Sequence, residues 1–275
     1  MTTPEQWEQW NGAVGRFWAD HDAYYDHRLA ALSERLLHAL DLRPADRVLD
    51  VGCGCGQTSR AVAAKVPDGV VHGIDLSEAM LARARERAAE AGLGNITFEA
   101  ADAQERPPPH AVYDWILSRF GVMFFDDPAT AFTGLRRGLR PGGTLSFLCW
   151  REPGENRTVP REALARVVDV PPLPDPRLPG AFSLADRTHL RELLAGAGFT
   201  EIDLTPLTEP VWSGEDAATA ARIMVHEPTT RALLERGGPA LTERAVASLE
   251  AALAPFETPE GVLLGSAAWL VSAQV

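Results

Sequence analysis

An acidic residue and a run of glycines stand close together in the stretch VLDVGCGCGQTS, which covers residues 48–59. Asp50 precedes Gly52 by two positions, and Gly54 and Gly56 follow at the same spacing. Because glycine has no Cβ, each of these residues can adopt a positive φ and let a ligand lie against the backbone. The pattern predicts a strand, a tight turn and a helix that together admit a small molecule.

This turn departs from the dinucleotide fingerprint G-x-G-x-x-G/A, in which the third small residue lets the helix pack closely on the strand. Counted from Gly52, that third position holds Gln57; counted from Gly54, it holds Ser59. No Lys-Ser or Lys-Thr pair follows the glycines to clamp a phosphate. A ligand without a pyrophosphate fits the turn better, and an NAD-linked oxidoreductase stays open as an alternative.

Apolar runs and helical periods alternate from residue 46 to residue 197. The expected strands cover residues 47–52, 70–75, 95–100, 112–118 and 144–150, and the expected helices lie near 57–65, 78–91 and 128–140. Ser77 and Asp127 occupy N-cap positions, and Gly92 follows the second of these helices. Such alternation is typical of an α/β fold with a parallel sheet and helices on both faces.

Two stretches interrupt the alternation. Residues 153–180 contain seven prolines, which exclude a long helix or a central strand. Residues 214–257 hold two helical periods between the apolar runs 198–212 and 262–275. Since substrates usually bind at the loops of an α/β sheet, we expect two inserts, 151–183 and 213–259, to form a cap on the substrate side.

An aromatic segment precedes the first expected strand. Its aromatic side chains recur at helical spacing and then as a pair: Trp7, Trp10, Phe17, Trp18, Tyr24 and Tyr25. Two interpretations fit the pattern. The stripe is either a docking face on the rest of the chain or part of a helical lid, residues 1–28, that excludes water and attracts a cation.

Charge and composition limit the possible partners. The formal net charge of −12 argues against a nucleic-acid surface, which needs clustered Lys and Arg. Three cysteines cannot build a disulfide framework. The first residues lack the basic and apolar regions of a signal peptide, and no apolar run is long enough to span a membrane. We therefore expect a cytoplasmic protein with a small-molecule partner.

His21 and His27 lie near Asp22 and Asp26 in the expected lid. A metal site needs a defined number and geometry of ligands, which one short helix rarely supplies, so we expect none. His21 is the candidate general base, because imidazole titrates near neutral pH and this segment would close over the site. The alternatives are a solvated or merely packed His21 and a transfer in which positioning suffices and water takes the proton. His226 is the other histidine expected on the pocket side.

Five segments occur together in the order VLDVGCGCG, GIDLSEAM, AADAQ, YDWILSRFGVMFF and GLRPGGTLSFLCW. In this order and spacing the chain resembles the class I S-adenosylmethionine-dependent methyltransferases, near the ubiquinone/menaquinone-biosynthesis type and small-molecule, natural-product relatives. The resemblance is clear over residues 29–150 and elsewhere rests on topology. It implies a Rossmann-like, seven-stranded, mostly parallel sheet with an antiparallel last strand, and a cofactor-binding domain over residues 29–275.

The resemblance also implies roles for individual residues. Asp50 would lie near the amino group of S-adenosyl-L-methionine, Asp75 would accept from its ribose hydroxyls, and Asp102 from its adenine amine. Asp102 can alternatively cap a turn. Besides the glycines, further candidate cofactor contacts are Gln57, Thr58, Leu76, Met80, Ala103 and Ser118. Candidate substrate and lid residues are Trp18, Tyr24, Tyr25, Phe120 and Trp150.

The same features leave several alternatives open. A protein that binds this cofactor without methylating, such as a cyclase or a regulatory binder, would carry the same motifs. The acceptor, the methylated atom (O, N or C) and the choice between monomer and homodimer are not specified. Bacterial secondary metabolism is the expected context.

Overall fold

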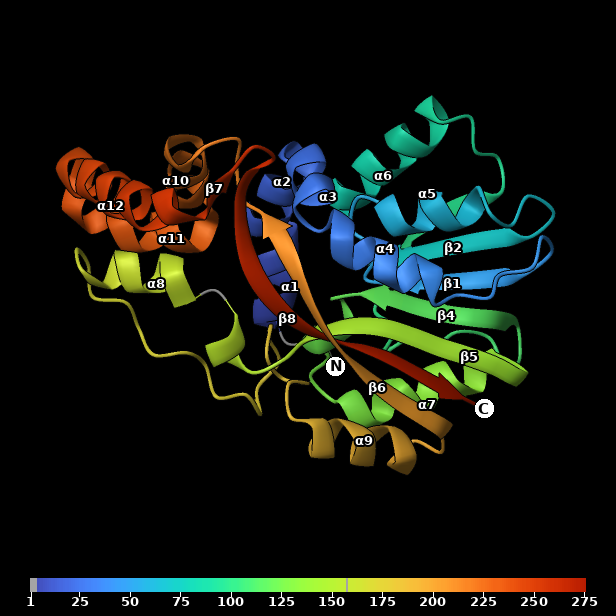
Figure 1. Cartoon of the computed structure of the whole chain (residues 1–275). Helices are drawn as coiled ribbons and strands as arrows, with labels where there is room; N and C mark the ends of the chain where they lie inside the picture. The colour runs from blue at the N-terminus through green and yellow to red at the C-terminus, as the bar shows by residue number, and fades with distance from the viewer. Residues whose placement is uncertain (1–3, 157) are drawn as a thin grey trace.

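One twisted sheet organises the chain in the computed structural model, which describes residues 4–156 and 158–275 (Figure 1). Within these residues seven strands lie in the order β3-β2-β1-β4-β5-β8-β6, and β7 pairs with β8 outside this path. β8 runs antiparallel to both β5 and β6. The predicted mostly parallel sheet with an antiparallel last strand is confirmed. The strands are β1 Arg47–Val51, β2 Val70–Asp75, β3 Ile96–Ala100, β4 Tyr113–Arg119, β5 Leu139–Trp150, β6 Thr200–Trp212, β7 Glu257–Thr258 and β8 Gly261–Gln274.

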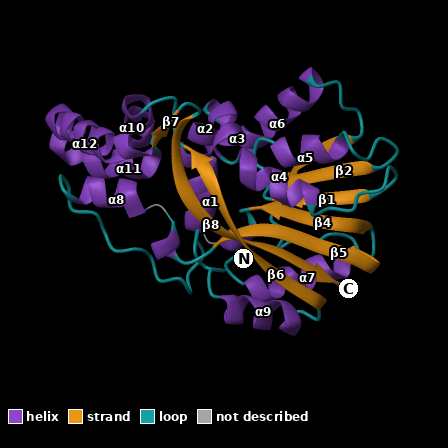
Figure 2. Cartoon of the chain, viewed as in Figure 1, coloured by secondary structure: helices purple, strands orange, loops and turns teal. Residues whose placement is uncertain are grey.

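Helices cover both faces of the sheet, as the alternation predicts. On one face lie α4 (Ala30–His38), α5 (Gln57–Ala63) and α6 (Glu78–Glu90); on the other lie α7 (Pro128–Gly138) and α9 (Arg187–Gly196) (Figure 1). Figure 2 shows the strands as the layer between these two sets of helices. The central strands are therefore buried on both faces, which explains why β1 and β4 read as apolar runs.

The two expected caps begin their helices. The Ser77 hydroxyl accepts a hydrogen bond from the Met80 amide at 3.4 Å, and the Asp127 carboxylate accepts one from the Thr130 amide at 3.0 Å. Each side chain satisfies an amide that the first helical turn leaves without an internal partner. The predicted starts of α6 and α7 are confirmed.

The start of β5 differs from the prediction. A helix to residue 140 and a strand from residue 144 were expected, whereas α7 ends at Gly138 and β5 begins at Leu139. Leu139 pairs with Tyr113, and the register shifts before the next pair. The Pro141-Gly142 segment therefore lies inside an irregular strand, with Gly142 at a φ of +78°.

Two groups of helices lie beyond the sheet. Near the start of the chain, α1 (Pro4–Asn11), α2 (Ala13–Asp20) and α3 (Asp22–Arg28) follow one another, and α2 packs against α6. At the far end of β6 and β8, α8 packs on α12, which also contacts α10 and α11 (Figure 1). The helices of this second group are α8 Thr158–Ala165, α10 Ala217–His226, α11 Pro228–Leu234 and α12 Gly238–Leu253. The short 3-10 helices of the described residues are η1 Val122–Phe124, η2 Pro153–Glu155, η3 Glu235–Gly237 and η4 Ala254–Phe256.

The second group corresponds in sequence to the two expected inserts. The Ser248 hydroxyl of α12 donates to the Ala163 carbonyl of α8 at 2.7 Å, so the two inserts are joined. Their role as a substrate cap stays a prediction. In the described part of the chain, no helix combines the length and apolar character required to cross a bilayer.

The glycine turn yields a test of the fold. Gly56 has a φ of +75°, and an added Cβ would lie 2.8 Å from Phe98 Cζ and 3.0 Å from Ala84 Cβ. Gly92 has a φ of +66° with nothing within 4 Å of an added Cβ. We expect Gly56→Ala to lower the free energy of unfolding by about 2–4 kcal/mol, because conformational cost and overpacking add. Gly92→Ala, the control, should lose about 1 kcal/mol. Equal losses in chemical denaturation would contradict the packing of α5 against β3.

Candidate functional site

A cavity opens where β1, β2 and β4 end. Its lining includes Asp50 from β1, Asp75 from the end of β2, Asp102 just after β3 and Phe120 just after β4. Parallel α/β sheets bind ligands at this edge, outside the carboxyl ends of the strands. Of the predicted cofactor contacts, those that line the cavity are Asp50, Gly52, Gly54, Thr58, Asp75, Leu76, Met80, Asp102 and Ala103. Of the predicted substrate and lid residues, Trp18, Tyr25, Phe120 and Trp150 line it.

Some predicted contacts are absent from the described lining and instead support it. Gly56 begins α5, and the Gln57 side-chain oxygen accepts from Arg119 Nη1 at 3.0 Å. The Ser118 hydroxyl donates to the Val51 carbonyl at 2.7 Å and is fully buried. Tyr24 lies on α3 with its hydroxyl 3.4 Å from the Ser213 carbonyl. These four residues shape the strand ends and the helices above them.

His21 also lies outside the described lining of the cavity. Its ring stacks on Phe17 with centroids 4.1 Å apart, and Nδ1 lies 2.8 Å from the Phe17 carbonyl oxygen. A general base must reach the proton that it removes. The structure places His21 as a packed residue at the junction of α2 and α3, and we do not propose it as the base.

Asp75 is a buried carboxylate that joins two loops. Its Oδ2 accepts a hydrogen bond from the Gly54 amide at 2.8 Å, and its Oδ1 accepts one from the Ser77 amide at 2.9 Å. Burial raises the pKa of Asp75, while these amide donors act in the opposite direction. The carboxylate thus holds the glycine turn against the start of α6, and each oxygen keeps a lone pair for a ligand.

Asp50 is fully buried, and only one of its two carboxylate oxygens has a hydrogen-bond partner among the described residues. Its Oδ2 accepts from the Ser59 hydroxyl at 2.5 Å, while Oδ1 is buried without a hydrogen-bond partner among the described residues. Burial raises the pKa of Asp50 to about 7, although the Ser59 hydrogen bond and the charge of Arg119 lower it. A buried acceptor without a partner is costly. The geometry suits a ligand that brings a cationic donor, such as an ammonium group.

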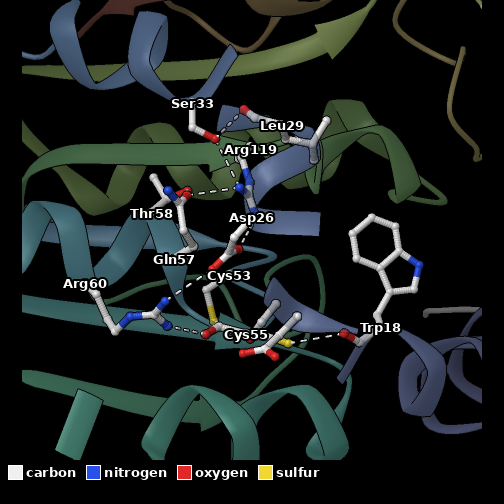
Figure 3. A network of polar contacts seen from close by, with 12 residues as sticks. Trp18, Asp26, Leu29, Ser33, Cys53, Cys55, Gln57, Thr58, Arg60 and Arg119 are labelled. Carbon is white, nitrogen blue, oxygen red and sulfur yellow. Dashed lines mark hydrogen bonds and ion pairs between the residues drawn. The ribbon is translucent and has the colours of Figure 1, made fainter. Parts of the chain in front are cut away.

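Arg119, the last residue of β4, lies at the centre of a polar network (Figure 3). Its Nη1 donates to the Ser33 hydroxyl at 3.1 Å and to Gln57 Oε1 at 3.0 Å, and its Nη2 lies 3.7 Å from Asp26. Arg60 reaches the other oxygen of Asp26 at 3.3 Å. Burial raises the pKa of Asp26 and lowers that of Arg119. The network joins α3, α4, α5 and β4 beneath the cavity.

A second acidic residue of α3 fastens the N-terminal helices to α6. Asp22 is 5% exposed, lines the cavity and pairs with Arg83 at 3.1 Å and Arg87 at 2.6 Å. Burial alone would raise the pKa of Asp22, but the hydrogen bonds from Arg87 and Arg83 lower it to about 2. Among the residues that the structure describes, no group of three or more His, Cys, Asp and Glu side chains could hold a metal ion.

Aromatic rings line the remainder of the cavity. Trp18 stacks on Tyr25 with centroids 3.6 Å apart, and Phe120 stacks on Trp150 at 4.0 Å. Trp10 meets Phe124 edge to face at 5.1 Å. Phe120 has a φ of +63°, a strained conformation for a bulky residue that usually persists at functional sites. Strain at Phe120 indicates that the position of its ring matters.

Sequence reasoning did not select Arg28, Arg119 and Phe124, which line the cavity. It named Trp10 only as part of the aromatic segment, and Asp22 and Asp26 only as neighbours of two histidines. One signal for Arg119 was present, since a charged residue directly after an apolar parallel strand lies at the ligand-binding edge. The two acids of α3 give no such signal, because the arginines with which they pair lie far away in the sequence.

The domain is similar in sequence to known proteins. A methyltransferase-domain family matches residues 48–143. The 27-O-demethylrifamycin SV methyltransferase of Amycolatopsis mediterranei (strain S699) is 36% identical over 132 residues, which cover 48% of this chain and 48% of that protein. A ubiquinone/menaquinone biosynthesis C-methyltransferase of Teredinibacter turnerae is 37% identical over 114 residues, 41% of this chain and 46% of that protein. The chain spans about half the length of these curated relatives.

The fold is similar to that of a solved methyltransferase. Phosphoethanolamine N-methyltransferase 2 of Haemonchus contortus, solved in complex with S-adenosyl-L-methionine, has a TM-score of 0.57 and 18% identity. The match covers 94% of this chain and 56% of that one. At this identity the likeness concerns the fold, and it confirms the predicted Rossmann-like class. The sequence matches confirm the resemblance to class I methyltransferases.

The ion pairs of Asp22 generate a test of how the N-terminal helices are held. We expect Asp22→Asn to reduce stability at neutral pH by about 2 kcal/mol. Because the folded-state pKa lies below its ordinary value of 3.8, the contribution is present above pH 3.8 and is lost as pH falls toward about 2. Hydrogen exchange should then accelerate across α1 to α3.

Asp20→Asn is the matched control, because Asp20 is exposed and the substitution removes the same charge from the same segment. Melting curves and hydrogen exchange that are the same for both variants would show that the Asp22 pairs do not hold these helices.

Proposed function

We propose, from the match of residues 48–143 to a methyltransferase-domain family, that the protein is a class I S-adenosylmethionine-dependent enzyme that transfers a methyl group to a small-molecule acceptor. The observation that carries the proposal is the convergence of Asp50, Asp75 and Asp102 on one cavity with aromatic walls. Asp50 lies near the end of β1, Asp75 ends β2 and Asp102 follows β3, so three neighbouring strands bring their carboxylates to one edge of the sheet, where one extended ligand can meet all three.

The donor set of the cavity fits S-adenosyl-L-methionine. The unpartnered Oδ1 of Asp50 can accept from the ligand ammonium, and Asp75 can accept from ribose hydroxyls with its remaining lone pairs. Asp102 accepts from the Gln104 amide at 2.8 Å and lies where it can also receive the adenine amine. Arg119, whose guanidinium lines the same cavity near Asp50, supplies a cation for the ligand carboxylate.

The cofactor supplies an activated methyl group on a sulfonium. The residues of the chain bind the reactants, align them and exclude water. Trp10 and Trp18 cover the cavity from α1 and α2, and aromatic faces attract a cation. Alignment of two bound reactants can contribute several kcal/mol to a transfer reaction. In this proposal α1 to α3, which lie within the expected lid of residues 1–28, cover the cavity.

The aromatic walls favour an acceptor with a flat apolar body. Phe120, Met123, Phe124, Phe125 and Trp150 line this side of the cavity, and Ala181 comes from the first insert. The net charge of −12 disfavours a nucleic acid. The proposal includes a cytoplasmic enzyme of bacterial secondary metabolism. It is supported by the similarity to the methyltransferase of Amycolatopsis mediterranei, whose name gives 27-O-demethylrifamycin SV as its acceptor.

Product analysis tests the activity. Incubation with methyl-labelled S-adenosyl-L-methionine and a panel of aromatic hydroxy and carboxylic acids should yield labelled product and S-adenosylhomocysteine in equal amounts. Tight binding of the cofactor without product from any acceptor would favour a binder that does not methylate, such as a cyclase or a regulatory protein. Failure to bind either S-adenosyl compound in calorimetry would overturn the proposal.

The state of Asp50 predicts how cofactor binding depends on pH. With a pKa of about 7, Asp50 is partly protonated in the free protein near neutral pH. An ammonium ligand favours the carboxylate, so affinity for S-adenosylhomocysteine should rise as pH increases through about 7. Binding below that pH should release a proton, which calorimetry detects by comparing buffers of different ionisation enthalpy.

The variant Asp50→Asn isolates this group, because it removes the titration and keeps the shape. It should bind more weakly and release no proton at this site. If wild type and Asp50→Asn exchange the same number of protons on binding, Asp50 does not meet the ammonium.

A further inference from the structure

Arg28, the last residue of α3, is a second cation in the lining of the cavity. Its side chain is buried, with 5% of the residue exposed. A guanidinium remains charged in proteins, so burial demands compensation by an acid or by a full set of hydrogen bonds. The surroundings of Arg28 show how far that demand is met.

All hydrogen bonds that Arg28 makes within the described residues start at Nη1. This nitrogen donates to the Tyr24 hydroxyl at 3.1 Å, the Trp212 carbonyl at 3.3 Å and the Ser213 hydroxyl at 3.0 Å. Nε is buried without a partner. These contacts hold the guanidinium at the end of β6 with neutral groups only, and they leave donors of the planar fork unused.

The two acids of α3 already pair with other arginines. Asp22 binds two arginines of α6, and Asp26 lies between Arg60 and Arg119. In the described part of the chain, Arg28 forms no ion pair within 4.0 Å. It is therefore a buried cation of the cavity lining without an acidic partner at ion-pair distance among the described residues.

We propose that Arg28 binds an anionic oxygen of the methyl acceptor, which makes the acceptor an aromatic-sized organic acid. This inference rests on the proposed function and names its substrate class. A carboxylate matches the planar fork of a guanidinium, and charge-assisted hydrogen bonds of this kind are about twice as strong as neutral ones. The walls formed by Phe120, Trp150 and their neighbours accept the apolar body of the same molecule.

A methyl acceptor with no hydrogen-bonding oxygen at this position would leave the buried Nε of Arg28 without a partner, and a neutral one would leave its charge without a counter-charge. Sites built to hydrogen-bond a substrate group discriminate strongly against analogues that lack it, since buried polar groups then stay unpaired. Arg28 is thus a residue that determines specificity for acids over their neutral analogues. Tyr24 and Ser213 position its guanidinium.

The test uses pairs of probes with the same shape and different charge: benzoate with benzamide, and naphthoate with naphthamide. Each is titrated into the protein saturated with S-adenosylhomocysteine. Wild type should bind at least one acid more tightly than its amide by about tenfold or more. Arg28→Gln should abolish that preference, and Arg28→Lys should keep part of it because the charge remains without the fork.

Arg222→Gln is the control, because Arg222 is exposed on α10 and its loss changes the net charge equally. It should preserve the preference for acids. If wild type binds no acid better than its amide, or if Arg28→Gln keeps the preference, the proposal is wrong.

Binding of S-adenosylhomocysteine separates this proposal from the proposed function. Wild-type protein that does not bind it contradicts the methyltransferase assignment itself. Arg28→Gln should bind it as wild type does. A loss of this binding in Arg28→Gln, with no preference for acids in wild type, would place Arg28 in the cofactor site and overturn its role toward the acceptor.

Discussion

The clamp formed by the Asp75 carboxylate is the interaction on which the site depends. It accepts the Gly54 amide after β1 and the Ser77 amide before α6, so one buried side chain fixes the loops that follow two neighbouring strands. The Gly52 and Cys53 amides also donate to the Ile74 carbonyl at 2.9 and 3.0 Å, which seats the glycine turn on β2. With these loops held together, Asp50 and the turn face the same cavity as Asp75.

The polar groups of the site differ in whether they have partners within the protein. The acids of α3 have such partners, because Asp22 and Asp26 each lie between two arginines. Among the described lining residues, Asp50 Oδ1 and Arg28 Nε are buried polar atoms without a hydrogen-bond partner. The carboxylate oxygen of Asp50 suits an ammonium group at the glycine turn, and the guanidinium of Arg28 suits an anion near the end of β6. The aromatic stacks in the lining are apolar and suit the body of an acceptor.

Local sequence predicted the parts of the site that depend on single strands. Asp50, Asp75 and Asp102 follow apolar runs, and parallel strands must bring such positions to one edge. Sequence could not place residues whose partners are distant. Arg119 needs Ser33 and Gln57, and Arg28 needs Ser213. The stacking of His21 on Phe17 is local, but the sequence does not show which way the ring faces once the helices pack. Gly56 was interpreted as a ligand contact, whereas its lack of a side chain makes room for Phe98.

A crystal structure with S-adenosylhomocysteine tests the central claim most directly, because it locates one ligand against three carboxylates. The account predicts the ligand amino nitrogen within about 2.7–3.2 Å of Asp50 Oδ1, the ribose hydroxyls against Asp75 and the adenine beside Asp102. A ligand bound elsewhere, or one bound here while Asp50 Oδ1 still has no partner, would contradict it.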